Sequence, residues 1–226
     1  MNWQSKAAIM RFASQTPLGD RWYHWVQKKF GRLKAQPMAR LPIQTEMLKW
    51  LCECGFSIEG KTLFEVGTGH MPIVPIGFFL AGAGEIITVD LNRRIDWTLT
   101  RDSLRWMVEH RHELDALYQD VVPSHIFEER FAMLQRWQAD PKGFFDKANI
   151  HYRAPYDAAQ TDLPERSIDL HFSVTTLEHI PYNILTDIFT EAKRILRLDG
   201  LAIHFIDPSD HFQHQDKTSI LRKTAG

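Results

Sequence analysis

The sequence predicts an α/β domain built on a doubly wound, mostly parallel sheet. Two stretches support this expectation, residues 61–90 and residues 150–206, because in both of them short apolar strands alternate with glycine turns and helical segments. The predicted order is β-α-β, a helical insertion, and β-β-α-β. Parallel strands in such an order are joined by right-handed crossovers.

Residues 61–90 read as strand, glycine turn, apolar helix, turn and second strand. Leu63–Val66 form the first strand, and Gly67 and Gly69 let the backbone turn sharply after it. Pro72 suits the first turn of the helix, where a missing N–H costs little. Pro75 also lies among the first residues of the helix, whose N–H groups have no acceptor within the helix, so its missing N–H is tolerated too. Gly82 and Gly84 end the helix, and residues 86–89 form the second strand.

Asp90 stands at the carboxyl end of the second predicted strand. Open α/β sheets bind nucleosides at this edge, where an acid accepts from ribose hydroxyls. The dinucleotide fingerprint G-x-G-x-x-G would need a glycine at position 72, which is Pro72, and Glu65 is an unfavourable neighbour for a pyrophosphate. A cofactor with a cationic amino group and no phosphate fits better, and S-adenosylmethionine (SAM) is such a cofactor. A turn without any ligand is the alternative.

Length and composition allow one α/β domain with a small extension. The chain has 226 residues, 44% of them apolar, and a net charge of −1. The overall charge therefore gives no indication that the protein binds nucleic acid. Cys52 and Cys54 are too close for an unstrained disulfide, which predicts reduced thiols in a cytoplasmic protein. No apolar run is long enough to cross a bilayer.

Residues 1–58 are expected to be a helical extension, and residues 59–226 the cofactor-binding domain. The first forty residues are basic and carry interleaved aromatic side chains; their one acid is Asp20, and their basic residues are Lys6, Arg11, Arg21, Lys28, Lys29, Arg32, Lys34 and Arg40. Such a segment can lie on an anionic membrane or recruit an anionic substrate, or it can be a lid with its basic face in water. Residues 43–56 then read as the helix before the first strand.

A helical insertion of about residues 95–140 follows the second strand. Apolar spacing indicates one amphipathic helix over residues 95–108, continued by residues 114–118, and another over residues 126–137, ending before Pro141. The third strand, Ile150–Arg153, comes only afterwards. Inserted helices at this edge shape a substrate pocket or a dimer contact, or simply present a solvated face.

The second stretch contains the remaining strands. Residues 154–158 follow the third strand, and a short helix is expected after Asp157. The fourth strand is Ile168–Val174. A helix follows, ended by Asp199-Gly200, and Leu201–Ile206 form the fifth strand. The apolar residues expected on its buried side are Ile184, Leu185, Ile188, Phe189, Ala192, Ile195 and Leu196.

Over residues 60–207 the chain resembles the class I SAM-dependent methyltransferases. The resemblance rests on separated motifs in matching order: E-x-G-T-G at residues 65–69, D-A at 157–158, L-P at 163–164, S-x-D-L at 167–170 and L-E-H-I at 177–180. It implies a Rossmann-like methyltransferase fold. The chain departs from the family where His70 replaces the frequent third glycine, and where no strand-like runs remain for the C-terminal β-hairpin.

The resemblance also implies a role for each cofactor-binding residue. The methionine part of SAM would be held by Glu65, Gly67, Thr68 and Gly69, with Ser173 lining the same side near the sulfonium. Asp90, followed by Leu91, would bind the ribose hydroxyls. Asp157 would accept from the adenine amino group beside the Ala158 backbone.

His179 is the candidate catalytic residue. Methyl transfer from a sulfonium is an in-line displacement that needs alignment and exclusion of water, and an oxygen or amine acceptor also needs a base. His179 lies just beyond the fourth strand, beside Glu178, which could orient or tune it. The alternative is that His179 caps or packs the start of the following helix.

The segment after the fifth strand is rich in imidazoles and carboxylates: His204, Asp207, Asp210, His211, His214 and Asp216. Substrate contact, a metal site and a plain loop are the alternatives. No tight ligand spacing stands out, so no metal ligands are assigned. The fifth strand is predicted to be an edge strand with unpaired backbone groups. Another segment or a second subunit is therefore expected to cover it, and a homo-oligomer is one such arrangement.

The sequence therefore predicts a SAM-dependent methyltransferase that acts on a small-molecule or glycan-like acceptor. No nucleic acid partner is expected, and the basic aromatic N-terminus suggests peripheral membrane contact. The alternative is a SAM- or nucleoside-binding protein that has lost catalysis and serves as an interaction or regulatory module. An NAD-dependent oxidoreductase is disfavoured by Pro72 and Glu65.

Overall fold

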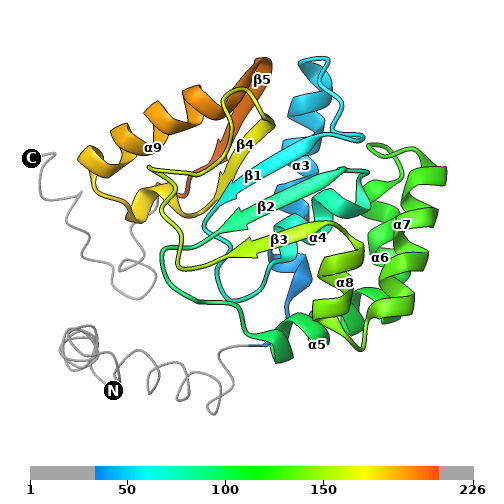
Figure 1. Ribbon diagram of the computed structural model, residues 1–226. Coiled ribbons are helices and arrows are strands. Elements are labelled where there is room, and N and C mark those ends of the chain that lie inside the picture. The colour runs from blue at the N-terminus through cyan, green and yellow to red at the C-terminus, as the bar shows by residue number, and fades with distance from the viewer. Residues whose placement is uncertain (1–33, 209–226) are drawn as a thin grey trace, which may run out of the picture.

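The fold is a five-stranded, all-parallel sheet with helices on both faces. A computed structural model describes residues 34–208, and its strands stand in the order β3-β2-β1-β4-β5 (Figure 1). The strands are β1 (Thr62–Val66), β2 (Glu85–Val89), β3 (Ile150–Arg153), β4 (Ile168–Val174) and β5 (Leu196–Phe205). The strand order reverses at β1, so the carboxyl edge between β1 and β4 is where an open sheet of this type forms a crevice.

The first β-α-β unit matches the sequence prediction. β1 pairs with β2 in parallel from Thr62↔Glu85 to Val66↔Val89. Between them α4 (Ile73–Leu80) is buried along its whole length. Pro72 is the N-cap and Pro75 lies in the first turn, where no N–H is needed. Gly82, with a φ of 99°, follows the C-cap and ends the helix.

The insertion contains more helices than the sequence predicted. They are α5 (Trp97–Glu109), α6 (Arg111–Tyr118), α7 (Ser124–Trp137) and α8 (Pro141–Lys147). The prediction that residues 114–118 continue α5 was wrong, because the chain turns at His110. The helix predicted over residues 126–137, ending before Pro141, is confirmed as α7. Pro141 itself begins a further helix, α8, where the Asp140 carboxylate accepts from Gly143 N at 3.1 Å. A proline with an aspartate before it starts a helix as readily as it ends one.

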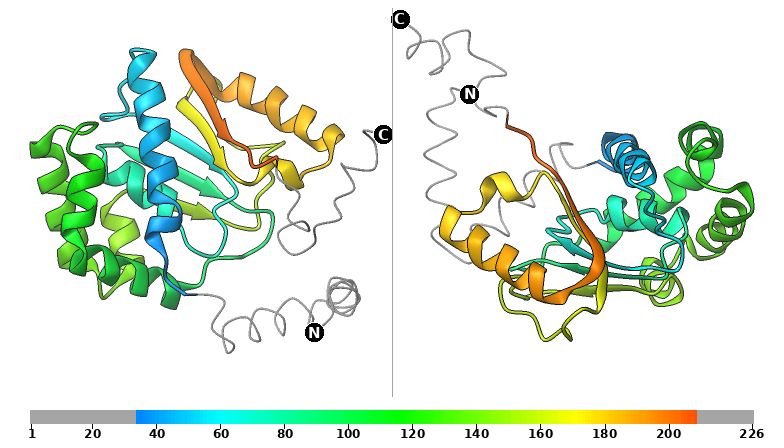
Figure 2. Two further views of the ribbon diagram at one scale, coloured as in Figure 1. Left: turned by 180° about the vertical axis from the view of Figure 1, so that it is seen from behind. Right: turned by 90° about the horizontal axis from the view of Figure 1, so that it is seen from above.

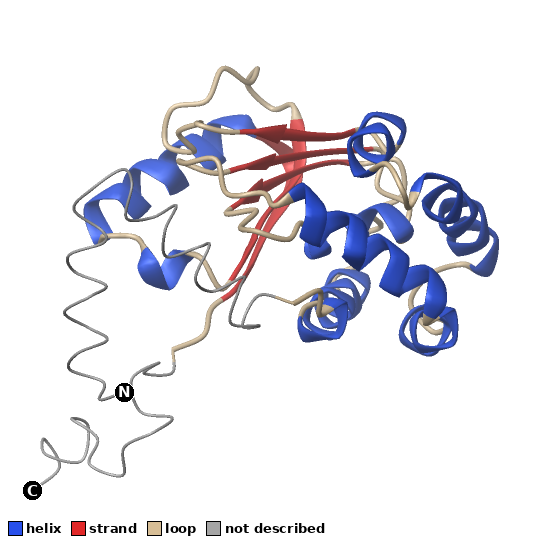
Figure 3. Ribbon diagram, turned by 90° about the horizontal axis from the view of Figure 1, so that it is seen from below, coloured by secondary structure: helices blue, strands red, loops and turns tan. Residues whose placement is uncertain are grey.

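The layer on one face of the sheet combines these helices with the N-terminal helix α3 (Leu41–Glu53), which follows a short 3-10 turn (Pro37–Ala39). Figure 2 shows α3 lying across the back of the sheet and, from above, the green inserted helices on the same side. Figure 3 shows that helices lie on both sides of the sheet. Leu41, Met47 and Leu51 are at most 2% exposed and belong to the main core. Residues 34–58 thus pack as part of that core.

The opposite face is covered by α9 (Tyr182–Ile195), after a 3-10 turn at Leu177–His179. The sequence prediction extended this helix to Asp199-Gly200, which is wrong: β5 begins at Leu196 and includes both residues. Leu196 already pairs with Ile168, and the register then shifts before Leu201 pairs with Leu170. Asp199 and Gly200 therefore lie inside this register shift, between the paired residues Leu196 and Leu201.

Two further predictions in this half were wrong. No helix follows Asp157, whose carboxylate accepts from Ala159 N at 2.9 Å and closes a tight turn instead. Ile184 and Phe189, expected to be buried, are 40% and 42% exposed. The reason is that β5 is the edge strand in the part of the chain described, so the outer side of α9 has no sheet beneath it.

Some expectations concern residues that the structure does not describe. The basic residues up to Arg32, and Asp210, His211, His214 and Asp216, lie outside residues 34–208. Within that range, no helix is long and apolar enough to span a membrane.

Candidate functional site

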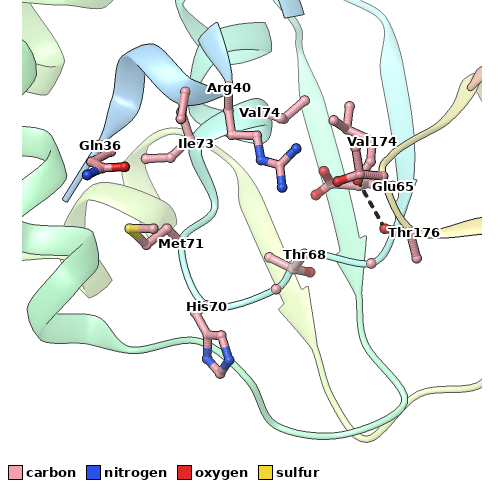
Figure 4. Close-up of a pocket in the computed structure, with 14 residues that line it drawn as sticks. Gln36, Arg40, Glu65, Thr68, His70, Met71, Ile73, Val74, Val174 and Thr176 are labelled. Carbon is pink, nitrogen blue, oxygen red and sulfur yellow. Dashed lines mark hydrogen bonds between the residues drawn. The ribbon is translucent and has the colours of Figure 1, made fainter. Parts of the chain in front are cut away.

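A cavity of about 370 Å³ opens at the carboxyl edge of the sheet, beside the glycine turn (Figure 4). Its walls come from segments that are far apart in sequence: the chain before α3, the end of β1, the turn leading into α4 and the end of β4. The lining residues are Gln36, Ala39, Arg40, Glu65, Gly67, Thr68, Gly69, His70, Met71, Ile73, Val74, Val174, Thr175 and Thr176. The cavity therefore lies at the predicted ligand-binding edge.

The glycine turn has the backbone that its sequence predicts. Gly67 and Gly69 have φ values of 92° and 71°, a region that other residues rarely adopt. Gly67 is also tight against β4, because a Cβ there would stand 2.3 Å from Thr176 Oγ1. Nothing lies within 4 Å of a Cβ built on Gly69. The first glycine thus closes the crevice, and the second leaves the turn accessible.

Glu65 places a carboxyl group at the floor of the cavity. It is only 2% exposed, and its Oε2 is hydrogen-bonded to the Thr88 hydroxyl on the neighbouring strand. Burial raises the pKa of Glu65 to about 8, aided by the charge of Asp90 and opposed by the Thr88 hydrogen bond and the charge of Arg40. A cationic ligand group beside Glu65 would stabilise the ionised form of this buried carboxyl.

Arg40 provides the positive charge of the cavity. It comes from the residue before α3, and its guanidinium points into the cavity toward Glu65 (Figure 4). Among residues 34–208 the guanidinium has no hydrogen-bond or ion-pair partner, while the Arg40 backbone N–H donates to Pro37 O at 2.9 Å. The sequence analysis counted Arg40 only as one of many basic residues. Arg40 precedes the helix predicted over residues 43–56 by three positions, and in the structure it directly precedes α3, which has Pro42 in its first turn.

Asp90 lies on the other side of the glycine turn and does not line the cavity. Its Oδ2 accepts from Gly69 N at 3.1 Å and from the Tyr152 hydroxyl at 3.4 Å. Burial raises the pKa of Asp90 to about 6, against the lowering effect of these hydrogen bonds, of Arg94 and of Thr68. Leu91, next in sequence, is 69% exposed. This arrangement suits a nucleoside: the Asp90 carboxylate can accept from ribose hydroxyls, and the exposed Leu91 side chain can pack against the base.

Two buried threonines, Thr68 and Thr88, extend the polar contacts of Glu65. Their hydroxyl oxygens are 2.5 Å apart, and the Thr88 hydroxyl also donates to Glu65 Oε2. Thr88 was not predicted as a site residue, because a threonine inside a β-strand usually signals only β-propensity.

The other predicted site residues lie apart from the cavity. Asp157 is exposed and Ala158 is 8% exposed, in the turn after β3. Ser173 is fully buried and hydrogen-bonded to His204 Nδ1 at 2.9 Å, and β4 reaches the cavity instead through Val174, Thr175 and Thr176. Side chains alternate along a strand, so Ser173 faces the α9 side while its neighbour faces the cavity.

His179 lies in the 3-10 turn after β4. Its side chain is exposed, its backbone N–H donates to Thr176 O at 3.1 Å, and it is absent from the cavity lining. Thr176, which does line the cavity, is thus linked to His179 through the backbone. Among residues 34–208 no group of three or more His, Cys, Asp or Glu side chains could hold a metal ion.

The chain matches no family model and no curated protein. Solved structures align with low scores. A "putative" S-adenosyl-L-methionine-dependent methyltransferase of Methanococcus maripaludis has a TM-score of 0.45 and 16% identity, over 78% of this chain and 60% of that one. Phosphoethanolamine N-methyltransferase 1 of Haemonchus contortus, solved with S-adenosylhomocysteine, has a TM-score of 0.41 and 16% identity, over 75% and 27%.

A third structure is geranyl diphosphate C-methyltransferase of Streptomyces coelicolor, with a TM-score of 0.39 and 13% identity, over 70% of this chain and 44% of that chain. This chain therefore spans less than two thirds of the length of each. Resemblance at this level is compatible with many functions, so the function has to be inferred from the residues of the cavity itself.

Proposed function

We propose that this protein is a SAM-dependent methyltransferase that transfers a methyl group directly to a small-molecule or glycan-like acceptor. The proposal depends on one observation above all: a carboxyl group and a guanidinium, Glu65 and Arg40, face each other across a cavity beside the glycine turn. A zwitterionic α-amino acid matches this pair of charges, with its ammonium toward Glu65 and its carboxylate toward Arg40.

The position of Asp90 extends this match to a nucleoside. The Asp90 carboxylate lies at the end of β2, and Gly69, which donates to it, also lines the cavity. One ligand could therefore place an amino acid in the cavity and ribose hydroxyls at Asp90. Few common cofactors join these two parts without a phosphate, and SAM is the one that the chain suits.

Each residue then has a defined task. Glu65 and Arg40 would hold the methionine head, Gly67 and Gly69 would let the ligand approach the backbone, and Asp90 would accept from the ribose. Bound SAM supplies an electrophilic methyl group, so the protein contributes orientation and exclusion of water. The placements of Asp157, Ala158, Ser173 and His179 in this scheme remain proposals based on the motif resemblance.

A second function is a SAM- or nucleoside-binding module without catalysis. The observation that favours it is that His179, the proposed base, does not line the cavity. The ionisable side chains that do are Arg40, Glu65 and His70, and the His70 Nδ1 is already 2.8 Å from Arg94 O. Direct measurement of methyl transfer distinguishes the two functions.

Calorimetric titration with SAM, S-adenosylhomocysteine and NAD tests the ligand class. We expect saturable heat with the first two and none with NAD, because the cavity carries Glu65 where a pyrophosphate would need donors. Saturable NAD binding, or silence with all three, would refute the proposal. Transfer of labelled methyl groups from SAM to a panel of small and glycan acceptors then separates an enzyme from a binding module.

A further inference from the structure

Thr175 has a backbone conformation that its side chain disfavours. Its φ is 48°, in the left-handed region, where a β-branched residue is an outlier. Two other non-glycine residues among 34–208 have a positive φ: Asn149, a residue type that tolerates it, and Arg166, which lies in an exposed turn. Thr175 is the β-branched member of this group, and it lines the cavity.

The fold fixes the residues on both sides of Thr175. Before it, β4 and β5 pair as far as Val174↔Phe205, and the Thr175 N–H donates to Phe205 O at 2.8 Å. After it, the Thr176 side chain lies against Gly67, and the Thr176 hydroxyl donates to Val174 O at 3.2 Å (Figure 4). The chain has to turn between these two anchors, so the strained conformation is imposed on Thr175.

This turn explains the backbone conformation but not the presence of a threonine. Glycine adopts a left-handed φ freely, and asparagine adopts it far more readily than a β-branched residue does. Either residue would therefore make the same turn with less strain. Strained backbone of this kind is concentrated at ligand-binding sites, where the surrounding structure holds a side chain ready for its partner.

The Thr175 hydroxyl is available to a ligand. The cavity is lined by three threonines, Thr68, Thr175 and Thr176. The Thr68 hydroxyl is bonded to Thr88, and the Thr176 hydroxyl is bonded to Val174 O. Within residues 34–208 the Thr175 hydroxyl has no hydrogen-bond partner, and Thr175 is only partly buried. Its hydrogen-bonding capacity is therefore left for a molecule in the cavity.

We propose that Thr175 binds the amino-acid head of the ligand through its hydroxyl; the inference rests on the proposed function for the identity of that ligand. Glu65 and Arg40, which match an ammonium and a carboxylate, line the same cavity as Thr175, whereas Asp90 does not. A hydroxyl both donates and accepts, so it suits a group that carries these two charges. Because the fold already fixes the backbone of Thr175, binding does not have to order it.

Two variants separate the hydroxyl from the shape of the side chain. Thr175→Val keeps the branched shape without the hydroxyl, and Thr175→Ser keeps the hydroxyl without the branch. Calorimetric titration should show a loss of affinity for S-adenosylhomocysteine of about tenfold to hundredfold in Thr175→Val, the scale of a hydrogen bond to a charged group. Thr175→Ser should retain most of the affinity.

A second ligand and a control variant locate the effect. 5′-Methylthioadenosine carries the nucleoside without the amino-acid head, so it should bind both Thr175 variants as well as it binds the unaltered protein. Thr186→Val is the matched control, because Thr186 is an exposed threonine of α9 whose hydroxyl donates to Tyr182 O. This control should bind both ligands with unchanged affinity.

The outcomes distinguish this role from the proposed function. Thr175→Val with full affinity for S-adenosylhomocysteine, an equal loss for both ligands, or an equal loss in Thr175→Ser would overturn the role of Thr175 and leave the proposed function intact. Failure of the unaltered protein to bind S-adenosylhomocysteine would refute the proposed function and the role of Thr175 together.

A measurement without ligand tests the strain. Thr175→Asn should raise the midpoint of urea denaturation, because asparagine tolerates the left-handed conformation. The same substitution at Thr186, inside α9, should not raise it, since asparagine and threonine have similar helix propensities. A lower midpoint for Thr175→Asn would mean that threonine suits this backbone better than asparagine does, and the inference from strain would be overturned.

Discussion

The Thr176 side chain of the β4 loop lies directly over Gly67 of the β1 loop, so close that a Cβ on Gly67 would stand 2.3 Å from Thr176 Oγ1. This contact joins the two loops at the point where the strand order reverses. It fixes one wall of the cavity that holds Glu65 and Arg40.

Gly67→Ala should destabilise the protein through both backbone strain and this contact. A left-handed φ costs a non-glycine residue about 1–3 kcal/mol, and the clash adds to it. Gly69→Ala is the matched control, since Gly69 has a similar φ and open space around it. Urea denaturation should give a larger loss for Gly67→Ala than for Gly69→Ala. Adding Thr176→Gly, which removes all three contacting atoms, should recover the part of the loss that comes from the contact and none of the part that comes from strain.

Arg40→Met should weaken binding of S-adenosylhomocysteine by about 1.5–3 kcal/mol, the range for hydrogen bonds to charged groups. It should leave the affinity for 5′-methylthioadenosine almost unchanged, because that ligand has no carboxylate. Calorimetry with both ligands measures the difference, and Arg40→Lys should restore part of the loss. An equal effect on both ligands would contradict the assigned role of Arg40.

Asp90→Ala should weaken SAM binding by about 1–3 kcal/mol, the scale for leaving buried hydrogen-bond partners unsatisfied. Asp102→Asn, on exposed α5 surface, serves as the control. Because Asp90 also accepts from Gly69 N, the melting temperature of the variant has to be measured beside its affinity. Unchanged affinity would argue against ribose recognition by Asp90.

Glu65→Gln should flatten the pH dependence of stability between pH 6.5 and 8.5. The folded-state pKa of Glu65 is raised to about 8 from 4.5, so the folded protein binds more protons than the unfolded chain in this window. Stability therefore falls as the pH rises, and the glutamine variant lacks this term. Denaturation midpoints across the window test this expectation, with Glu46→Gln as the control, because the Glu46 side chain is half-exposed on α3.

His171→Leu should make the protein less sensitive to acid. The His171 ring is fully buried, neither ring nitrogen has a hydrogen-bond partner among residues 34–208, and burial lowers the pKa of His171 to about 3. Its neutral form stabilises the fold fully above pH 6.5, and that contribution is lost as the pH falls. The variant should lose less stability than the natural chain between pH 6.5 and 4, whereas the exposed His125→Gln should behave like the natural chain.

Several of these residues could not be identified from the sequence. Arg40 resembles any basic residue until α3 places it opposite Glu65, 25 positions later. Ser173 was expected in the site, but the alternation of side chains directs it to His204. The contact between Glu65 and Thr88 depends on the strand register that pairs them, which no local pattern reveals.

Local chemistry in the sequence determined the strands β1 to β4, the glycine turn and the acids at the sheet edge, because glycine, proline and apolar periodicity act over a few residues. Tertiary structure alone decided where α9 ends, which face Ser173 presents and which distant side chains meet in the cavity. Those outcomes depend on strand pairing and packing between segments far apart in the chain, and propensity yields to them.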